Sequence, residues 1–343
     1  MSVRIAIFSD YAYPAGGTEQ FVLELIERAQ VDHEVKLISW SDDVIVPADF
    51  SAVTTPEFGD IRQVWEVADW AEAILVVTSF NVRLLARFAT DYLTERPKPS
   101  IAVVQTSAHS RESEARAVQE VWMRRLLGAC RATVAVSTAV RDALTPIAPD
   151  PRKLHVIENA ARITSRRSAR PQTWSNVSFV GRPEPQKGFH HFLQLASEPG
   201  LRDITFRANT VSMPPRETSE NVEFSWQLSE NEMVEFFGQA DLLVAPYTHG
   251  DGLPLALLEA LACDVPVVGF DSPAVTPLLV RHGQSVIPQE YSALKDFVHG
   301  WTARREVSET KPGPLVHSWD DQYAQYEALL HRISGREGAP VTA

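Results

Sequence analysis

Short apolar runs alternate regularly with helical patterns along this chain. In the first half, the apolar runs lie at residues 3–9, 35–40, 74–78, 101–105 and 133–136. Helical patterns such as VRLLARFATDYL separate them, and the order of strand, loop and helix restarts at NVSFVGRPEPQKGFHHFLQLA. Strands that alternate with helices at this spacing predict parallel sheets with helices on both faces.

The chain of 343 residues is long enough for two domains. The stretch AARITSRRSARPQTWSN at 160–176 is polar, rich in arginine and without apolar periodicity, which is typical of a linker. We therefore expect two doubly wound, Rossmann-like α/β domains. The predicted boundaries are a first domain at 1–160, a linker at 161–175, a second domain at 176–316 and a terminal helix at 317–334.

Charge and cysteine content narrow the possible partners. There are 32 basic and 44 acidic residues, a formal net charge of −12 with neutral histidine. Such a chain is a poor general binder of nucleic acid or of an anionic membrane, so local positive groups must hold any phosphate. Cys130 and Cys263 suggest neither a metal site nor a disulfide framework. Because the start MSVRIAIFSD reads as a strand and no apolar run reaches a membrane-spanning length, we expect a soluble, cytoplasmic protein.

Two carboxylates stand out in the stretch APYTHGDGLPLALLEALACDVPVVGFD at 245–271, which reads as a strand end, a glycine-containing loop, a helix and a strand. Asp251 lies on the loop, just before the helix, where a ligand anion can also bind. Glu259 lies within the helix among leucines. The simple alternatives are a helix N-cap for Asp251 and an exposed helix face for Glu259. The functional alternative is that both carboxylates accept hydrogen bonds from sugar hydroxyls.

Cations and glycines follow other predicted strands. Arg182 and Lys187 bracket a proline-containing loop that leads into a helix at Gly188. Two cations beside a helix N-terminus suit a diphosphate, although solvated charges on a surface turn remain the alternative. Gly16 and Gly17 follow the first strand, and they indicate either a close approach to a ligand or a tight turn.

His109 follows the apolar run at 101–105. It is either an ordinary loop residue or a polar group that points into a ligand crevice. The helical pattern VQEVWMRRLLGACRA pairs apolar residues with arginines. It could form an amphipathic surface for a lipid or a partner, but we favour a half-buried helix with a solvated arginine face.

Several blocks together resemble the retaining glycosyltransferases of family 4 in the sequence-based classification, which have the GT-B fold. The matching blocks are GGTE, TSAHS, AVST, VIENA, VGRPEPQKG, ADLLVAPY, DGLPLALLEALACDVPVVGFD and HSWDDQYAQY. They occur in the family's order and cover nearly the whole chain. The resemblance implies two Rossmann-like domains that face a deep cleft, with the terminal helix packed back on the first domain.

The resemblance also implies roles for individual residues. Arg182 and Lys187 match the pair that neutralises the donor diphosphate, and Glu259 matches the second glutamate of the family's E-x7-E motif, which binds the nucleotide ribose. Asp251 occupies the first position of that motif and would contact the transferred sugar, as would His109. The remaining expected donor-binding residues are Gly16, Gly17, Gly181, Gly252, Leu253 and Pro254.

Two residues depart from the family pattern. Asp251 is one methylene shorter than the usual glutamate, which can change the sugar hydroxyl that it meets. Asp264 stands where the family generally has glycine, so the turn before the next strand is expected to differ.

The resemblance thus implies a retaining transfer from a nucleotide-diphosphate sugar, with UDP as the commoner nucleotide of the family. We expect a small soluble acceptor, in natural-product or glycoconjugate biosynthesis. We expect no metal, and no cofactor beyond the nucleotide-sugar co-substrate. The alternatives are a sugar-nucleotide epimerase or phosphorylase of the same fold, and a non-catalytic nucleotide-binding subunit.

Overall fold

The structure is a computed structural model, and it forms two compact units. It describes residues 2–9, 16–39, 53–54, 61–106, 113–163, 175–210, 218–226, 228–248, 252–303 and 316–335. Unit 1 comprises residues 1–159, 251–253 and 319–343, and unit 2 comprises residues 160–250 and 254–318.

Unit 1 contains a seven-stranded parallel sheet in the order β3-β2-β1-β4-β5-β6-β7. The strands are β1 (Arg4–Ser9), β2 (Glu34–Ile38), β3 (Val53–Thr54), β4 (Ala73–Thr78), β5 (Ser100–Val104), β6 (Ala132–Ala135) and β7 (Leu154–Val156). The helices are α1 (Gly17–Asp32), α2 (Ile61–Trp70), α3 (Leu84–Glu95), α4 (Ser113–Ala129), α5 (Thr138–Leu144) and α11 (Trp319–Ile333), with a 3-10 turn, η1 (Pro151–Lys153).

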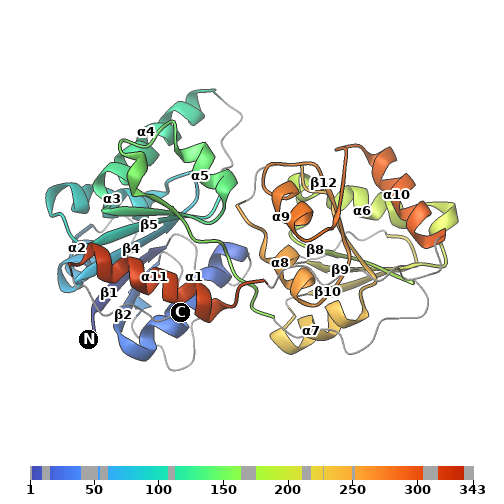
Figure 1. Cartoon of the computed structure of the whole chain (residues 1–343), viewed down its shortest axis with the longest axis horizontal. Coiled ribbons are helices and arrows are strands. Elements are labelled where there is room, and N and C mark those ends of the chain that lie inside the picture. Colours follow the sequence, from blue (N-terminus) through green and yellow to red (C-terminus); the bar gives the residue numbers. More distant parts are fainter. Residues whose placement is uncertain are drawn as a thin grey trace. The chain divides into compact units, whose positions relative to one another are not determined.

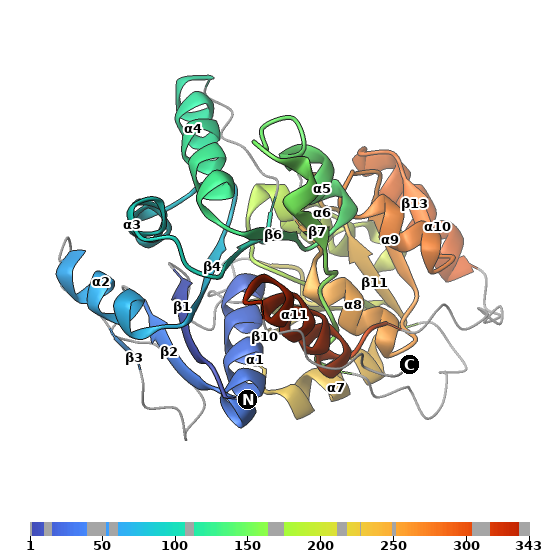
Figure 2. The ribbon, with the colours of Figure 1, turned by 60° about the vertical axis from the view of Figure 1, so that its left-hand side comes forward.

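Helices cover both faces of this sheet. Every residue of β4, β5 and β6 is buried, as expected for central strands of a parallel sheet. Figure 2 shows α1 and α11 side by side over one face, with α2 and α3 over the other. The ring of Phe21 on α1 lies 5.5 Å from that of Trp319 and 5.9 Å from that of Tyr326, measured between centroids. These contacts attach the terminal helix to unit 1.

Unit 2 contains a six-stranded parallel sheet in the order β10-β9-β8-β11-β12-β13 (Figure 1). The strands are β8 (Asn176–Val180), β9 (Thr205–Thr210), β10 (Val222–Trp226), β11 (Leu242–Ala245), β12 (Val267–Phe270) and β13 (Ser285–Ile287). The helices are α6 (Phe189–Ala196), α7 (Glu230–Gln239), α8 (Leu255–Ala262), α9 (Thr276–Arg281) and α10 (Tyr291–Ala303), with 3-10 turns η2 (Pro185–Lys187) and η3 (Pro199–Leu201).

The prediction of two doubly wound parallel sheets is confirmed. In unit 1 the strand order reverses between β1 and β4, and in unit 2 it reverses between β8 and β11. Ligands of such sheets bind beyond the carboxyl ends of the strands at this switch point. Most of the predicted linker at 161–175 falls outside the described residues, but Ala161 bridges Ser318 within unit 2. No helix in the described part of the chain has the length and apolar character needed to cross a membrane.

The turn after α8 explains why Asp264 is an unusual residue at its position. The N–H of Val265 donates to the Ala260 carbonyl (2.9 Å) and the N–H of Asp264 donates to that of Leu261 (3.1 Å), which is the Schellman pattern of helix termination. This pattern places Asp264 in the left-handed region, at a φ of 56°. Glycine occupies this conformation without the steric cost that a side chain incurs.

We predict that Asp264→Gly is more stable than Asp264→Ala by about 1 kcal/mol or more in free energy of unfolding, because only alanine must hold a Cβ at positive φ. Both variants lack the carboxylate, so their difference isolates the backbone conformation. Urea unfolding of the two proteins measures it. Equal midpoints and slopes would show that the turn is not strained.

Candidate functional site

The switch point of unit 2 brings together the loops that follow β8 and β11. The hydroxyl of Tyr247 donates to the Val180 carbonyl (2.9 Å), and the N–H of Thr248 donates to the Gln186 carbonyl (3.0 Å). These bonds join two segments that are far apart in the sequence. They hold the loop that carries Arg182 and Lys187 beside the end of β11.

The two predicted cations of this loop have different surroundings. The ammonium of Lys187 lies 4.4 Å from the centre of the Tyr247 ring, which is only 1% exposed. A cation over an aromatic face is attracted by the ring quadrupole, so Tyr247 restricts where Lys187 can go. Arg182 is half exposed and pairs with Glu184 at 3.1 Å, an interaction that contributes little in solvent. The guanidinium therefore remains able to meet an anion.

Gly188 joins this loop to α6 and leaves no space for a side chain. Its φ is 66°, and an added Cβ would lie 2.1 Å from the Pro246 carbonyl oxygen. The backbone of the cation loop therefore contacts the backbone after β11 directly. Gly181, at the start of the loop, also has a positive φ, of 155°.

Glu259 is buried on α8, with 6% exposure, so the alternative of an exposed helix face is wrong. Its Oε1 lies 3.9 Å from the Nε of Arg162, a buried nitrogen without a hydrogen-bond partner among the described residues. A buried carboxylate requires a compensating charge or donors, and Arg162 supplies a nearby charge. Arg162 falls in the predicted linker, and no local pattern in the sequence connects it with Glu259.

Gly252 and Leu253, expected to precede α8, are counted with unit 1. Ser137 Oγ donates to the Gly252 carbonyl and Asn159 Nδ2 donates to the Leu253 carbonyl, each at 3.2 Å. Pro254 is the N-cap residue of α8 and has no side-chain capping bond. Ser137 and Asn159 fall in the blocks AVST and VIENA, but no role was predicted for either residue.

The remaining predicted residues are the two glycines at the start of α1, Asp251 and His109. Gly17 opens α1, and Gly16 is its N-cap residue with extended backbone angles that any residue can adopt. The described atoms nearest to an added Cβ at Gly16 belong to the carboxylate of Glu19, which is the end of a flexible side chain. Asp251 and His109 both lie outside the described residues, so their roles stay predictions.

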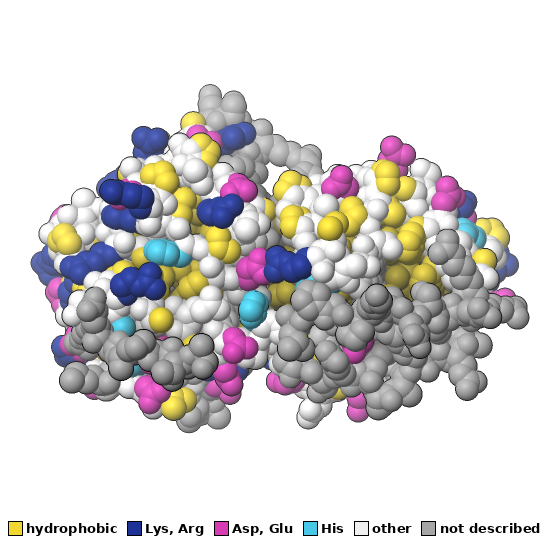
Figure 3. Space-filling view, in the orientation of Figure 1, with side chains coloured by type: hydrophobic (Ala, Val, Ile, Leu, Met, Phe, Trp, Pro, Cys, Tyr) yellow, Lys and Arg dark blue, Asp and Glu magenta, His cyan; other side chains and the backbone are white. Residues whose placement is uncertain are grey.

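Helix α4 matches the expected half-buried helix with an arginine face. Met123, Leu126 and Leu127 are buried. Arg125 pairs with Asp91 at 2.7 Å, and its guanidinium lies 4.4 Å from the centre of the Trp122 ring. Figure 3 shows basic side chains gathered over unit 1 on the viewed face. On α4, Arg125 is therefore held by neighbouring side chains of unit 1.

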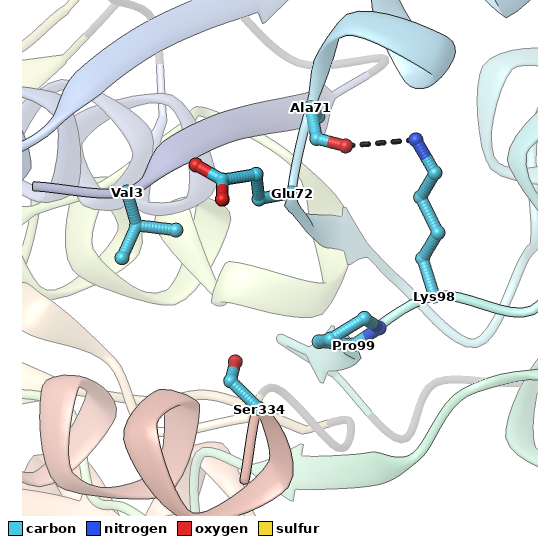
Figure 4. Close-up of a pocket in the computed structure, with 6 residues that line it drawn as sticks. All are labelled: Val3, Ala71, Glu72, Lys98, Pro99 and Ser334. Atoms are coloured by element: carbon cyan, nitrogen blue, oxygen red, sulfur yellow. Dashed lines mark hydrogen bonds between the residues drawn. The ribbon is translucent and has the colours of Figure 1, made fainter. Parts of the chain in front are cut away.

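A cavity of about 240 Å³ lies where the strands of the unit 1 sheet begin, at their amino ends (Figure 4). Its lining includes Val3, Glu72 and Pro99, which precede β1, β4 and β5. Lys98 donates to the carbonyls of Ala68, Asp69 and Ala71 at 2.7 to 2.9 Å, so its three N–H groups are used at the end of α2. Ligands of parallel sheets bind at the carboxyl ends of the strands, so this cavity is not the candidate site.

Two protein-family models match the chain. The model described as Glycosyltransferase Family 4 matches residues 15–164, and the model described as Glycosyl transferases group 1 matches residues 175–299. Together they account for most of both units. The chain belongs to the group 1 glycosyltransferases. Arg182, Lys187 and Glu259 all lie within the part that the group 1 model matches.

One relative is similar to part of the chain in sequence, and two solved structures are similar to it in fold. A phosphatidyl-myo-inositol mannosyltransferase of Propionibacterium freudenreichii subsp. shermanii is 31% identical over 109 residues, which are 30% of this chain and only 27% of the relative. The structure of a sucrose-phosphate synthase from Thermosynechococcus elongatus has a TM-score of 0.76 at 14% identity, covering 98% of this chain and 100% of that one. The Anabaena HepE protein, solved with UDP and glucose, has a TM-score of 0.67 at 14% identity, covering 97% and 98%.

We predict that Gly188→Ala lowers the free energy of unfolding by at least about 2 kcal/mol, because the new methyl combines a left-handed strain with a backbone clash. Gly238→Ala on α7 is the matched control, since nothing lies within 4 Å of its added Cβ. Thermal and urea unfolding compare the two variants. Equal stability would mean that the two loops are not packed together as described.

Proposed function

We propose that the chain is a retaining glycosyltransferase that moves a sugar from a UDP-sugar to a small soluble acceptor. The observation that carries this proposal is the arrangement at the switch point of unit 2. Two cations follow β8, Lys187 is held against Tyr247, and the helix after β11 carries the buried carboxylate of Glu259. Family membership supports transfer of a glycosyl group.

In this proposal Glu259 binds the ribose of the nucleotide. A carboxylate accepts two hydroxyl hydrogen bonds, which suits a ribose diol better than a base or a phosphate. Arg162 places a positive charge 3.9 Å from this carboxylate, in a helix that is otherwise apolar. The preference for UDP is supported by HepE, a similar fold solved with UDP.

Arg182 and Lys187 would bind the diphosphate and stabilise it as the leaving group. Breaking the bond at the anomeric carbon increases the negative charge on the departing phosphate. A well-placed donor stabilises such charge by roughly 3 kcal/mol in the transition state. Protein cations are able to supply this stabilisation, and we propose that the transfer needs no metal.

Retention of configuration would follow from attack by the acceptor on the same face as the departing phosphate, with that phosphate as the base. No carboxylate nucleophile of the type that retaining hydrolases use was identified in the sequence. Asp251 and His109 would contact the transferred sugar, and Gly16, Gly17 and Gly181 would border the donor. The acceptor would bind to unit 1, in natural-product or glycoconjugate synthesis.

We predict that Lys187→Ala weakens UDP binding by about tenfold or more but leaves uridine binding unchanged, since only the diphosphate needs the cation. Isothermal calorimetry with both ligands measures this. Lys295→Ala is the control. Lys295 pairs with Glu198 at 2.8 Å, and this pair is not part of the proposed site. Equal UDP affinity in parent and Lys187→Ala would reject the phosphate role.

We predict that Glu259→Gln abolishes a preference for UDP over 2′-deoxy-UDP, which should be about tenfold in the parent if the carboxylate binds the 2′-hydroxyl. The ratio of affinities within each protein cancels general effects of the substitution on folding. A parent that shows no preference, or a variant that retains it, would reject the ribose role.

The decisive test of the whole proposal is titration of the parent with UDP, GDP and ADP, with and without EDTA, followed by assay of the matching nucleotide sugars. Binding of UDP that EDTA does not change supports a metal-independent donor site. Conversion of the donor without any acceptor would favour an epimerase. Donor binding without turnover across a panel of acceptors would favour the non-catalytic subunit, and no nucleotide binding would reject the proposal.

A further inference from the structure

Polar groups that follow three neighbouring strands of unit 1 contact one short segment, Gly252–Leu253. Ser137 follows β6 and Asn159 follows β7, and their side chains donate to two consecutive carbonyls, those of Gly252 and Leu253. Both side chains are buried, at 5% and 4% exposure. Gln105 follows β5 and contacts the same segment through its backbone: an added Cβ at Gly252 would lie 1.7 Å from the Gln105 carbonyl oxygen.

The neighbours of Ser137 and Asn159 decide which of their atoms donate and which accept. Ser137 Oγ accepts from the N–H of Val140 (3.2 Å), so its hydroxyl hydrogen is left for the Gly252 carbonyl. The Nδ2 of Asn159 also lies 3.4 Å from Gln105 Oε1, and its Oδ1 accepts from the Nε2 of Gln322 (3.5 Å). The amide nitrogen of Asn159 therefore faces the Leu253 carbonyl, and its oxygen faces α11.

The orientation of the Gly252 carbonyl also sets the direction of the next backbone N–H, that of Leu253. In a trans peptide the C=O of Gly252 and the N–H of Leu253 point in opposite directions, and no described peptide bond is cis. The N–H of Leu253 thus points away from Ser137. Within the described ranges no group accepts a hydrogen bond from it. It is the last backbone N–H before Pro254, the N-cap of α8.

We propose that Ser137 and Asn159 are positioning residues for the donor phosphate: by holding the carbonyls of Gly252 and Leu253, they aim the N–H of Leu253 at a phosphate oxygen of the nucleotide. This inference rests on the proposed function. It assigns the phosphate a backbone donor whose direction is set by two side chains of unit 1, which follow β6 and β7. Neither Ser137 nor Asn159 needs to touch the nucleotide.

Two uncharged substitutions at Ser137 test the proposal. Ser137→Ala removes the hydroxyl that donates to the Gly252 carbonyl, whereas Ser137→Thr keeps a hydroxyl that can cap α5 and donate to the same carbonyl. Neither variant adds a charge that would repel the diphosphate. We expect Ser137→Ala to bind UDP about tenfold more weakly than Ser137→Thr, with the same affinity for uridine. Asn159→Leu, which removes the donor to Leu253 without adding a charge, should weaken UDP binding relative to the parent in the same selective way.

Thr90→Ala is the control for general loosening of unit 1, since the buried Thr90 hydroxyl donates to the Ala86 carbonyl within α3 (2.6 Å). It should lower stability and leave both affinities unchanged. Equal UDP affinity of Ser137→Ala and Ser137→Thr, while the parent binds UDP, overturns the positioning role and leaves the proposed function standing. A parent that binds no nucleoside diphosphate rejects both.

Hydrogen exchange of the parent gives a second readout that needs no variant to fold. Addition of saturating UDP should slow exchange of the Leu253 amide, whereas uridine should not. An amide that exchanges at the same rate with UDP and without ligand would also overturn the positioning role.

Discussion

Parallel strand pairing determines where the loops of both sheets meet and which faces must be covered. Because all strands of a sheet run in one direction, every loop that follows a strand emerges at the same edge. Residues that are widely separated in sequence become neighbours there, such as Lys187 after β8 and Tyr247 after β11, or Ser137 after β6 and Asn159 after β7. The same pairing requires burial on both faces, and the helices provide it.

The two ion pairs that involve predicted site residues of unit 2 differ in how far they are buried. Arg182 and Glu184 meet in solvent, where an ion pair contributes little and is easily exchanged for another partner. Glu259 and Arg162 meet in the interior, where removal of either charge would leave the other uncompensated. The first arrangement is suited to binding and releasing an anion, and the second to holding a carboxylate in one place.

The fold and part of the site could be predicted from sequence because their signals are local. Alternating apolar and helical patterns predicted both sheets, and Arg182 and Lys187 stood out in a loop between a strand and a helix. The glycine expected at position 264 pointed to a special turn, and Asp264 does adopt a positive φ. The surroundings of these residues were not predictable in the same way. Arg162 beside Glu259 and Tyr247 beneath Lys187 depend on contacts between distant segments, and no periodicity or spacing records such contacts.

The position of α11 has a consequence for how the chain is made. A ribosome completes all of unit 2 before it reaches Trp319, although α11 belongs to unit 1. Until then, the face of the sheet that α11 covers, with Ile5, Leu75 and Ile101 near Tyr326 and Leu330, has no permanent cover. Nascent unit 1 must therefore carry an exposed apolar surface while unit 2 folds, and such surfaces favour aggregation or chaperone capture. Synthesis from N- to C-terminus thus makes the first unit to emerge the last to be completed.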